Sequence, residues 1–175
     1  MMMSCAALTS ALYGALCLNL PMSFRLPVSS PVGRWVVEGD DDGLTHVWFP
    51  ADKKSLTHKG VPTLVEKAAA QLEEYFAGER TFFETDLHVD GTDFQIDVWR
   101  ALTQIPFGEV ATYRDIATAV CRPAAVRAVG NANGKNPFPV IVPCHRVLAS
   151  NGLGGYSGGL EIKEFLLELE GWSVF

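Results

Sequence analysis

The residues with the clearest capacity for chemistry lie in one short stretch, 136–147, which reads NPFPVIVPCHRV. Cys144 and His145 follow directly on an apolar run that is bounded by prolines. A histidine beside a cysteine lowers the pKa of the thiol and so raises the fraction of nucleophilic thiolate. The pair is therefore consistent with a cysteine nucleophile, with a metal ligand, or with a small buried residue that ends a strand.

The apolar run 140–142 predicts a short buried strand, which ends at Pro143 because proline cannot donate to a strand ladder. Successive side chains of a strand point to opposite faces, so Cys144 and His145 can act together only if the backbone turns here. From residue types alone, the alternative of a buried structural Cys144 with His145 as a polar neighbour stays open.

Two further features follow the cysteine. The loop 150–160, SNGLGGYSGGL, carries five glycines around Tyr156 and Ser157. Such a loop is either merely mobile or lets backbone N–H groups approach a ligand closely, and the tyrosine suits an aromatic ligand. Glu170 ends the last predicted helix, 160–170, where its carboxylate is available to orient a histidine ring as the third member of a triad.

The distribution of charge separates one segment from the rest of the chain. The net charge is −6, which taken alone argues against a nucleic-acid partner. Residues 100–148, however, hold six basic residues against two acidic ones. Local charge, not net charge, decides where a phosphate backbone is attracted, so this segment of an acidic protein keeps a nucleic-acid partner open.

The cysteines argue against a structural metal or a disulfide framework. The chain has four of them, with no CxxC pair and no repeated spacing: Cys5, Cys17, Cys121 and Cys144. A zinc site that combines Cys5 and Cys17 with His46, His58 and His88 has no supporting spacing. We therefore expect no metal, no organic cofactor and a reducing cytoplasmic location.

The first 21 residues stand apart, since no charged residue occurs before Arg25. A membrane anchor or signal peptide is one interpretation, but no basic residue precedes the apolar run and Pro21 interrupts it. We expect instead that translation begins at Met22 and that 1–21 is an extension, either disordered or loosely docked, or not part of the native protein. No membrane association is predicted.

The segment 22–90 predicts a small α/β domain. Two runs rich in β-branched and aromatic residues, 33–38 and 44–49, flank the turn signal GDDDG and predict a hairpin. Apolar residues at three- and four-residue spacing predict a helix over 61–79, with Gly78 at its end. The run 81–91 predicts a further strand.

The segment 91–175 predicts a mainly helical domain. Asp93 is the expected cap of a first helix, and Thr112 is a good N-cap for a second, 113–121. Pro123 begins a third helix that carries Arg127. The second and third helices have the outline of a helix-turn-helix, which by itself is a weak indication of DNA binding.

Four motifs of this region together resemble the O6-alkylguanine-DNA alkyltransferases, also called methylated-DNA–protein-cysteine methyltransferases. They are FGEVATYRDIA, RAVGNANGKNP, IVPCHRV and GGYSGGLEIKEFLLELEG, in this order and at the expected spacing. The resemblance is continuous from about 93 to 171. It implies an α/β (α+β) protein, with a ribonuclease H-like sheet and helix in the first domain and a helix-turn-helix in the second.

The resemblance also implies roles for individual residues. The catalytic set is Cys144, His145, Glu170, Tyr113 and Asn136. The DNA-binding set is Arg127, Thr112, Tyr113, Ala128, Asn133 and Lys135. The set that holds the target base is Tyr156, Ser157, Gly158 and Val147.

In this family the cysteine takes the alkyl group and the histidine deprotonates it through a bound water. Glu170 matches the carboxylate that orients the histidine, and Tyr113 the phenol that helps to protonate the leaving guanine. Arg127 is similar to the arginine that enters the duplex in place of the flipped base. Asn136 matches a residue that forms hydrogen bonds within the site turn.

The implied function is single-turnover DNA repair, in which the alkyl group of O6-methylguanine, and of O4-methylthymine, passes to Cys144. The implied partner is double-stranded DNA, bound by a monomer through the minor groove with the alkylated base flipped out. Departures from the family are small: Thr112 stands where serine is common, and the substrate loop is a residue shorter than in human-type proteins. A related non-catalytic class has tryptophan in place of Cys144.

Two other functions remain as alternatives. One is a helix-turn-helix protein that binds or senses damaged DNA and whose cysteine is structural. The other is a cysteine hydrolase of small acyl substrates, which leaves the basic segment and Arg127 without a role.

Overall fold

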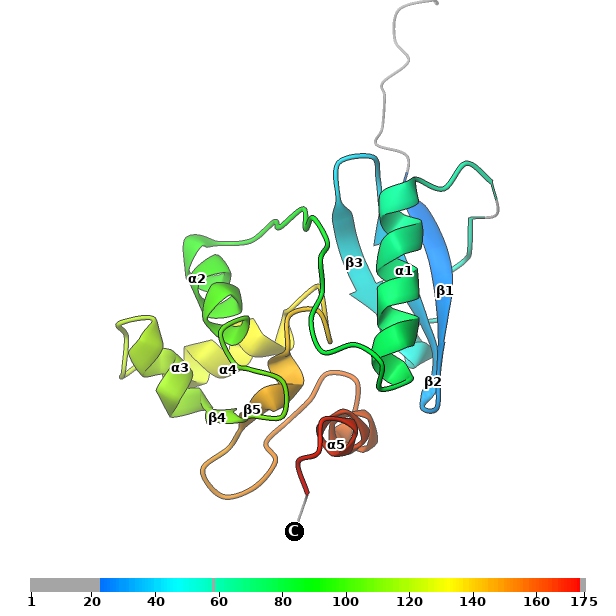
Figure 1. Cartoon of the computed structure of the whole chain (residues 1–175). Coiled ribbons are helices and arrows are strands. Elements are labelled where there is room, and N and C mark those ends of the chain that lie inside the picture. Colours follow the sequence, from blue (N-terminus) through cyan, green and yellow to red (C-terminus); the bar gives the residue numbers. More distant parts are fainter. Residues whose placement is uncertain (1–22, 58, 174–175) are drawn as a thin grey trace, which may run out of the picture.

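The computed structural model describes residues 23–57 and 59–173, which form two regions packed side by side (Figure 1). A sheet with one helix makes up the first region, and short helices joined by loops make up most of the second. This arrangement confirms the predicted α/β class, with a small sheet domain followed by a mainly helical part. The predicted extension 1–21 lies outside the described residues.

The sheet of the first region is antiparallel, with its strands in sequence order: β1 (Phe24–Ser30), β2 (Gly33–Gly39) and β3 (Leu44–Trp48). The predicted hairpin is thus confirmed. Its turn is held by Asp40, whose carboxylate accepts hydrogen bonds from the backbone N–H of Asp42 and Gly43. The helix α1 (Thr63–Phe76) lies across one face of the sheet (Figure 1). It buries Val65, Ala68, Leu72 and Phe76, which are four of the residues whose spacing predicts it.

The predicted strand at 81–91 is wrong. This segment crosses from α1 to the second region without regular structure and makes a single bridge to the sheet, between Leu87 and Leu44. At Glu84 both backbone groups bond to the side-chain amide of Gln71, on α1, at 2.8 and 3.1 Å. A helix side chain therefore takes the place that a neighbouring strand would fill.

The second region begins with α2 (Asp93–Leu102). Its N-cap is Thr92, not the predicted Asp93, because the Thr92 hydroxyl accepts from the N–H of Gln95 in a capping box. Thr112 is confirmed as the N-cap of α3 (Tyr113–Ala119). After a turn, α4 (Val126–Gly134) completes the two helices of the predicted helix-turn-helix. The short strands β4 (Ala111–Thr112) and β5 (Val147–Leu148) pair in parallel beneath them.

The predicted strand at 140–142 is also wrong, and this error bears directly on the site. The chain from Asn136 turns back on itself, so that Val142 N–H donates to Phe138 O at 2.8 Å. Val140 lies in the left-handed region at φ 76°, a rare conformation for a β-branched residue. Cys144 then begins a 3-10 turn, η2 (Cys144–Arg146), instead of continuing in an extended conformation.

The last helix, α5 (Leu160–Leu169), ends one residue before its predicted end and leaves Glu170 as its C-cap. A short 3-10 turn, η1 (Pro50–Asp52), follows β3. No helix within the described part of the chain is long and apolar enough to cross a membrane.

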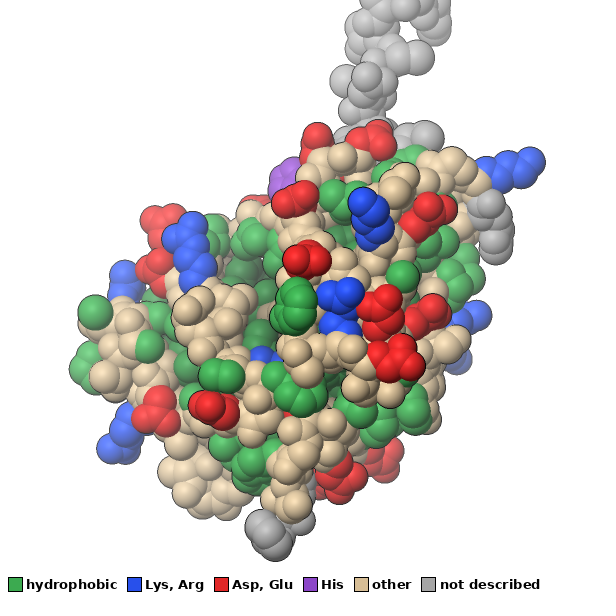
Figure 2. Space-filling view, in the orientation of Figure 1, with side chains coloured by type: hydrophobic (Ala, Val, Ile, Leu, Met, Phe, Trp, Pro, Cys, Tyr) green, Lys and Arg blue, Asp and Glu red, His purple; other side chains and the backbone are tan. Residues whose placement is uncertain are grey.

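The two regions share one core and a backbone hydrogen bond. Val47 of β3 donates its N–H to the carbonyl oxygen of Pro137, the residue that follows Asn136, at 2.8 Å. The buried cluster runs from Trp35 and Leu72 of the first region to Val129 and Leu166 of the second. The surfaces differ in charge: acidic side chains gather over α1 on the face seen in Figure 2.

Candidate active site

The nucleophile candidate opens onto a cavity that both regions line. Cys144 is 4% exposed and lies in the wall of a cavity of about 280 Å³. The side chains and backbone of the wall come from the residue after β3, from α3 and α4, from the turn before the cysteine and from the glycine-rich loop. They are Phe49, Tyr113, Gly130, Asn133, Gly134, Asn136, Cys144, Gly155, Tyr156 and Ser157.

Asn136 builds the turn that presents the cysteine. Its side-chain amide donates to Val142 O at 2.8 Å, and its Oδ1 accepts from Phe138 N–H at 3.0 Å. The amide of Asn133, on α4, donates to Cys144 O at 3.3 Å. Because these side chains supply partners that a strand would take from a neighbour, the backbone is free to turn, and Cys144 and His145 do not alternate as on a strand.

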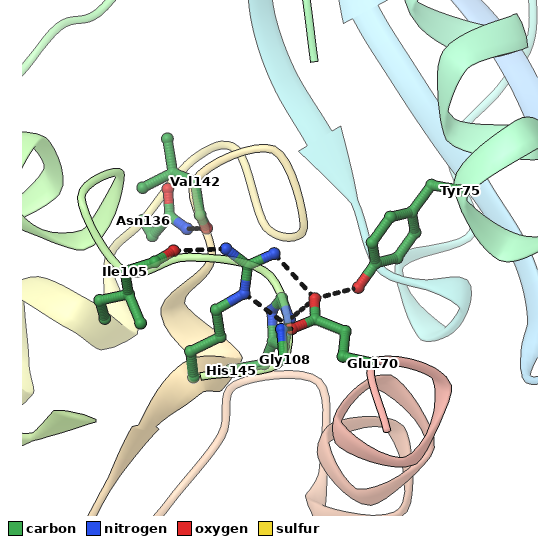
Figure 3. A network of polar contacts seen from close by, with 8 residues as sticks. Tyr75, Ile105, Gly108, Asn136, Val142, His145 and Glu170 are labelled. Carbon is green, nitrogen blue, oxygen red and sulfur yellow. Dashed lines mark hydrogen bonds and ion pairs between the residues drawn. The ribbon is translucent and has the colours of Figure 1, made fainter. Parts of the chain in front are cut away.

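The histidine is joined to the carboxylate that the sequence suggests. His145 is fully buried, and its Nε2 bonds to Glu170 Oε1 at 2.8 Å (Figure 3). Arg146 holds the same carboxylate with two hydrogen bonds, from Nε at 2.8 Å and from Nη2 at 2.9 Å. Tyr75 of α1 donates its hydroxyl to Oε1 at 2.6 Å, and Gly108 N–H donates to Oε2 at 3.2 Å.

This network fixes charge and tautomer. Burial alone would raise the pKa of Glu170, but hydrogen bonds from His145 and Arg146 bring it down to about 2. Burial lowers the pKa of His145 below its ordinary 6.5, so the ring is neutral at pH 7. With Nε2 donating to the carboxylate, the other nitrogen, Nδ1, carries the lone pair and is the basic atom.

Three buried polar atoms around the cavity have no hydrogen-bond partner among the described residues: Asn133 Oδ1, His145 Nδ1 and Tyr156 Oη. Buried polar atoms are nearly always paired, and leaving one unpaired costs about 1–3 kcal/mol. Asn133 and Tyr156 line the cavity themselves. Their grouping is typical of a site that completes its hydrogen bonds with a polar ligand.

The thiol is held in its neutral form in the free protein. Burial raises the pKa of Cys144, while the nearby Asn136 amide and Tyr156 hydroxyl favour the thiolate. The ammonium of Lys163, also buried, acts in the same sense; its Nζ donates to Val147 O at 2.6 Å and to Leu153 O. Burial lowers the pKa of this lysine to about 8, against the pull of the sulfur.

Tyr113, the first residue of α3, contacts the glycine-rich loop. Its hydroxyl donates to Gly155 O at 3.4 Å, and burial raises the pKa of the phenol, which therefore keeps its proton. Gly154, at φ 72°, lies so close that a Cβ there would stand 3.1 Å from the tyrosine ring. The loop also bonds to α4, because the Ser157 hydroxyl donates to Gly134 O at 2.8 Å.

The implied DNA-binding residues fall into two groups. Arg127, Ala128 and Lys135 are exposed on or just after α4, and Thr112 and Tyr113 are half-buried at the start of α3. Asn133 differs, since it is 4% exposed and lines the cavity. Its place in the cavity wall suits a role in the reaction site better than a contact with the DNA surface.

The implied base-holding residues are divided as well. Tyr156 and Ser157 line the cavity, whereas Val147 is fully buried in β5 and does not. Gly158 lies behind the wall, where a Cβ would stand 2.5 Å from the ring of Phe49.

Two aromatic residues of the first region belong to the site and were missed in the sequence. Tyr75 bonds to Glu170, and Phe49 lines the cavity. Both occur in apolar patterns where an aromatic residue indicates only a core position. The single available signal was for Phe49, which is the last residue of the predicted hairpin strand 44–49.

Comparison with known proteins agrees with this geometry. Residues 93–172 match the family model for the DNA-binding domain of 6-O-methylguanine DNA methyltransferase, and residues 25–89 match its ribonuclease-like domain. A methylated-DNA–protein-cysteine methyltransferase of Methanosarcina acetivorans is 49% identical over 150 residues, covering 81% of this chain and 94% of that relative. The constitutive enzyme of Bacillus subtilis is 43% identical over 159 residues, covering 85% and 96%.

Solved structures give the same result. The crystal structure of the Mycobacterium tuberculosis O6-methylguanine methyltransferase aligns with a TM-score of 0.76 at 42% identity, covering 85% of this chain and 93% of that one. The M. tuberculosis OGT in complex with DNA aligns with a TM-score of 0.74 at 46% identity, covering 82% and 90%. On its sequence and its fold, the chain belongs to the 6-O-methylguanine DNA methyltransferase family.

Proposed function

We propose that Cys144 is the alkyl acceptor of this protein and that His145 and Glu170 form the base that activates it. The activity is DNA repair, in which an alkyl group passes from DNA to a cysteine of the protein. One observation carries the assignment to Cys144. It lines a cavity directly before a buried histidine whose Nε2 is fixed on a carboxylate and whose Nδ1 has no partner among the described residues.

The transfer is a displacement at carbon. The thiol loses its proton toward Nδ1 of His145, through a water as the family resemblance implies, and the sulfur attacks the alkyl carbon. A bond forms between sulfur and carbon while the bond from carbon to guanine O6 breaks, and its electron pair stays on the guanine. Tyr113, whose raised pKa keeps it protonated before the step, gives its hydroxyl proton to the guanine as it leaves and regains a proton through solvent from His145, which holds the one taken from the thiol. The net result is a thioether and an unmodified guanine that has gained the thiol proton.

The thioether explains why one molecule acts once. The described residues at the cavity provide no second thiol to take the alkyl group over, since the other free cysteine, Cys121, is exposed in the turn between α3 and α4. The step balances with thiol and alkylated base alone. It therefore needs no metal or organic cofactor.

We further propose that α4 enters the minor groove of double-stranded DNA and that the alkylated guanine is flipped out into the cavity. A base inside the duplex cannot reach a sulfur that is 4% exposed, so the base must leave the stack. Gly130 and Gly134 of α4 line the cavity, while Arg127 and Ala128 are exposed on the same helix. The helix that would contact DNA thus also forms the entrance wall.

A monomer suffices for this function, because every residue of the proposed site comes from one chain. A reducing cytoplasm suits the site, since both cysteines of the described part of the chain are free thiols.

Labelled transfer tests the proposal. Duplex DNA that bears O6-methylguanine with a labelled methyl group is incubated with the protein, which is then digested. We expect one label per protein molecule, on the peptide that contains Cys144, and none in Cys144→Ala. Cys121→Ser is the matched control, because it removes the other free thiol without touching the cavity, and it should transfer as the wild type does.

Two results would overturn the assignment. Normal binding of lesion DNA by Cys144→Ala, with no transfer by the wild type, would indicate a damage-sensing protein whose cysteine is structural. Many turnovers on an activated ester, in place of a single transfer, would indicate a cysteine hydrolase.

A further inference from the structure

The first region contributes one wall of the cavity. Phe49, at the end of β3, lines it together with Cys144 and Tyr156, although it lies 95 positions before the cysteine in the sequence. The remaining lining residues belong to α3, α4, the nucleophile turn and the glycine-rich loop. The space in front of the sulfur is therefore set partly by the first region.

Phe49 is a fixed wall. Its N–H donates to the Asp52 carboxylate at 2.9 Å, which ties it to η1. Its ring packs against the fully buried Trp35 at a centroid distance of 5.2 Å. Two residues earlier, Val47 bonds to Pro137 O, so the end of β3 is also joined to the nucleophile turn. A side chain held by packing and by its backbone on both sides has little freedom to retreat from a bulky group.

Phe49 also supports the residue beside the sulfur. Its ring meets Tyr156 edge to face at a centroid distance of 5.5 Å. Tyr156 lines the same cavity as Cys144. Phe49 further abuts Gly158, where a Cβ would stand 2.5 Å from the ring, so the loop approaches the ring as closely as a glycine permits. Moving the Phe49 wall would let Tyr156 and the loop shift away from the sulfur.

We infer that Phe49 is a specificity-determining residue that limits the size of the alkyl group transferred to Cys144. This inference rests on the proposed function. All O6-alkylguanines share the same base, so the alkyl group is the part that varies, and it must lie at the sulfur when it is transferred. In an apolar pocket, one methylene changes discrimination by about 10–200-fold, and replacing Phe49 changes the wall by more than that.

Competing transfers measure the effect. The same duplex is prepared with O6-methylguanine or O6-benzylguanine at one position, and the second-order rate of alkylation of Cys144 is measured for each. The readout is the ratio of the benzyl rate to the methyl rate, which does not depend on the folded fraction of a preparation. We expect Phe49→Ala to raise this ratio by at least about tenfold. Phe49→Leu should raise it less, and Phe49→Trp should lower it.

The matched control is Phe76→Leu. The ring of Phe76 packs against the same tryptophan, Trp35, at a centroid distance of 5.4 Å. Phe76 does not line the cavity. It should lower thermal stability and leave the ratio at the wild-type value. A ratio unchanged in all three Phe49 variants, or shifted in the same direction by leucine and tryptophan, overturns the inference and leaves the proposed function intact. Absence of methyl transfer to Cys144 in the wild type overturns the proposed function itself.

Discussion

The molecule contains two arginine–carboxylate pairs of nearly the same geometry that serve different ends. Arg25 holds Glu38 through Nε and Nη2, both at 2.8 Å, in the sheet of the first region. Arg146 holds Glu170 through the same two atoms, at 2.8 and 2.9 Å, behind the nucleophile. Each carboxylate also accepts from an aromatic donor at 2.6 Å, Trp48 for Glu38 and Tyr75 for Glu170.

The difference lies in where the donors come from and what else they touch. The donors of Glu38 come from its own sheet, apart from Ser23, which directly precedes it. Glu170 gathers donors from α1, from η2 and from the loop before β4, and one of them is the base His145. The Arg25–Glu38 pair therefore stabilises a single sheet, whereas the Arg146–Glu170 pair joins segments that are distant in the sequence. Its chemistry depends on the histidine, not on the ion pair.

The two arginine–carboxylate pairs should differ most in how the rate of methyl transfer responds when the charge of the carboxylate is removed. We expect Glu170→Gln to slow methyl transfer at least about 100-fold, because an amide can stabilise the wrong histidine tautomer and no longer balances Arg146. Glu38→Gln should leave the transfer rate per folded molecule unchanged. Single-turnover kinetics on O6-methylguanine duplex DNA measure both. Equal losses in the two variants would show that stability, not the histidine contact, accounts for the effect.

We expect acid to remove the stability that each of the two carboxylates, Glu38 and Glu170, contributes. The pKa of each carboxylate is lowered from 4.5 to about 2 in the folded protein. A depressed folded pKa contributes stability that is present above pH 4.5 and is lost as pH falls through about 2. The contribution is on the order of 3 kcal/mol for each group.

Denaturant unfolding between pH 5 and pH 2 measures this loss. We expect Glu38→Gln and Glu170→Gln each to flatten the dependence of the unfolding free energy on pH. A flattening by one variant only would mean that the other carboxylate gains nothing from its donors in the folded state.

Removing the aromatic hydrogen-bond donors should have the smallest effect on stability and on the transfer rate. Tyr75→Phe removes one hydrogen bond from Glu170 and Trp48→Phe removes one from Glu38, at a cost of about 1–3 kcal/mol each in stability. Only Tyr75→Phe should also slow transfer, by less than about tenfold, because Glu170 then binds His145 less firmly. Urea unfolding and single-turnover rates together test this. An unchanged rate in Tyr75→Phe would confine the role of Tyr75 to folding.

The parts of the site that the sequence predicted are those whose chemistry is local. Asn136, Cys144 and His145 lie within the single stretch 136–147, and Glu170 ends a helix whose periodicity is plain. The strands of the hairpin, α1 and the two helices of the helix-turn-helix follow from patterns of the same kind. Their residue types carry the information within a few positions.

The parts that could not be predicted depend on contacts between distant segments. Tyr75 and Phe49 look like ordinary core residues until the fold brings them to the site. The strands expected at 140–142 and 81–91 failed for a related reason. In both places a side-chain amide, from Asn136 or from Gln71, takes the backbone partners that a neighbouring strand would supply. Composition does not show such a substitution.

The hydrogen bond from Val47 to Pro137 has a consequence for how much damage a cell can clear. It ties the sheet to the nucleophile turn, so loss of structure in the first region disturbs the acceptor as well. A protein that acts once removes as many lesions as there are intact copies. Repair capacity then depends on the number of folded molecules, and a substitution in β3 that unfolds the first region lowers this number although Cys144 itself is unchanged.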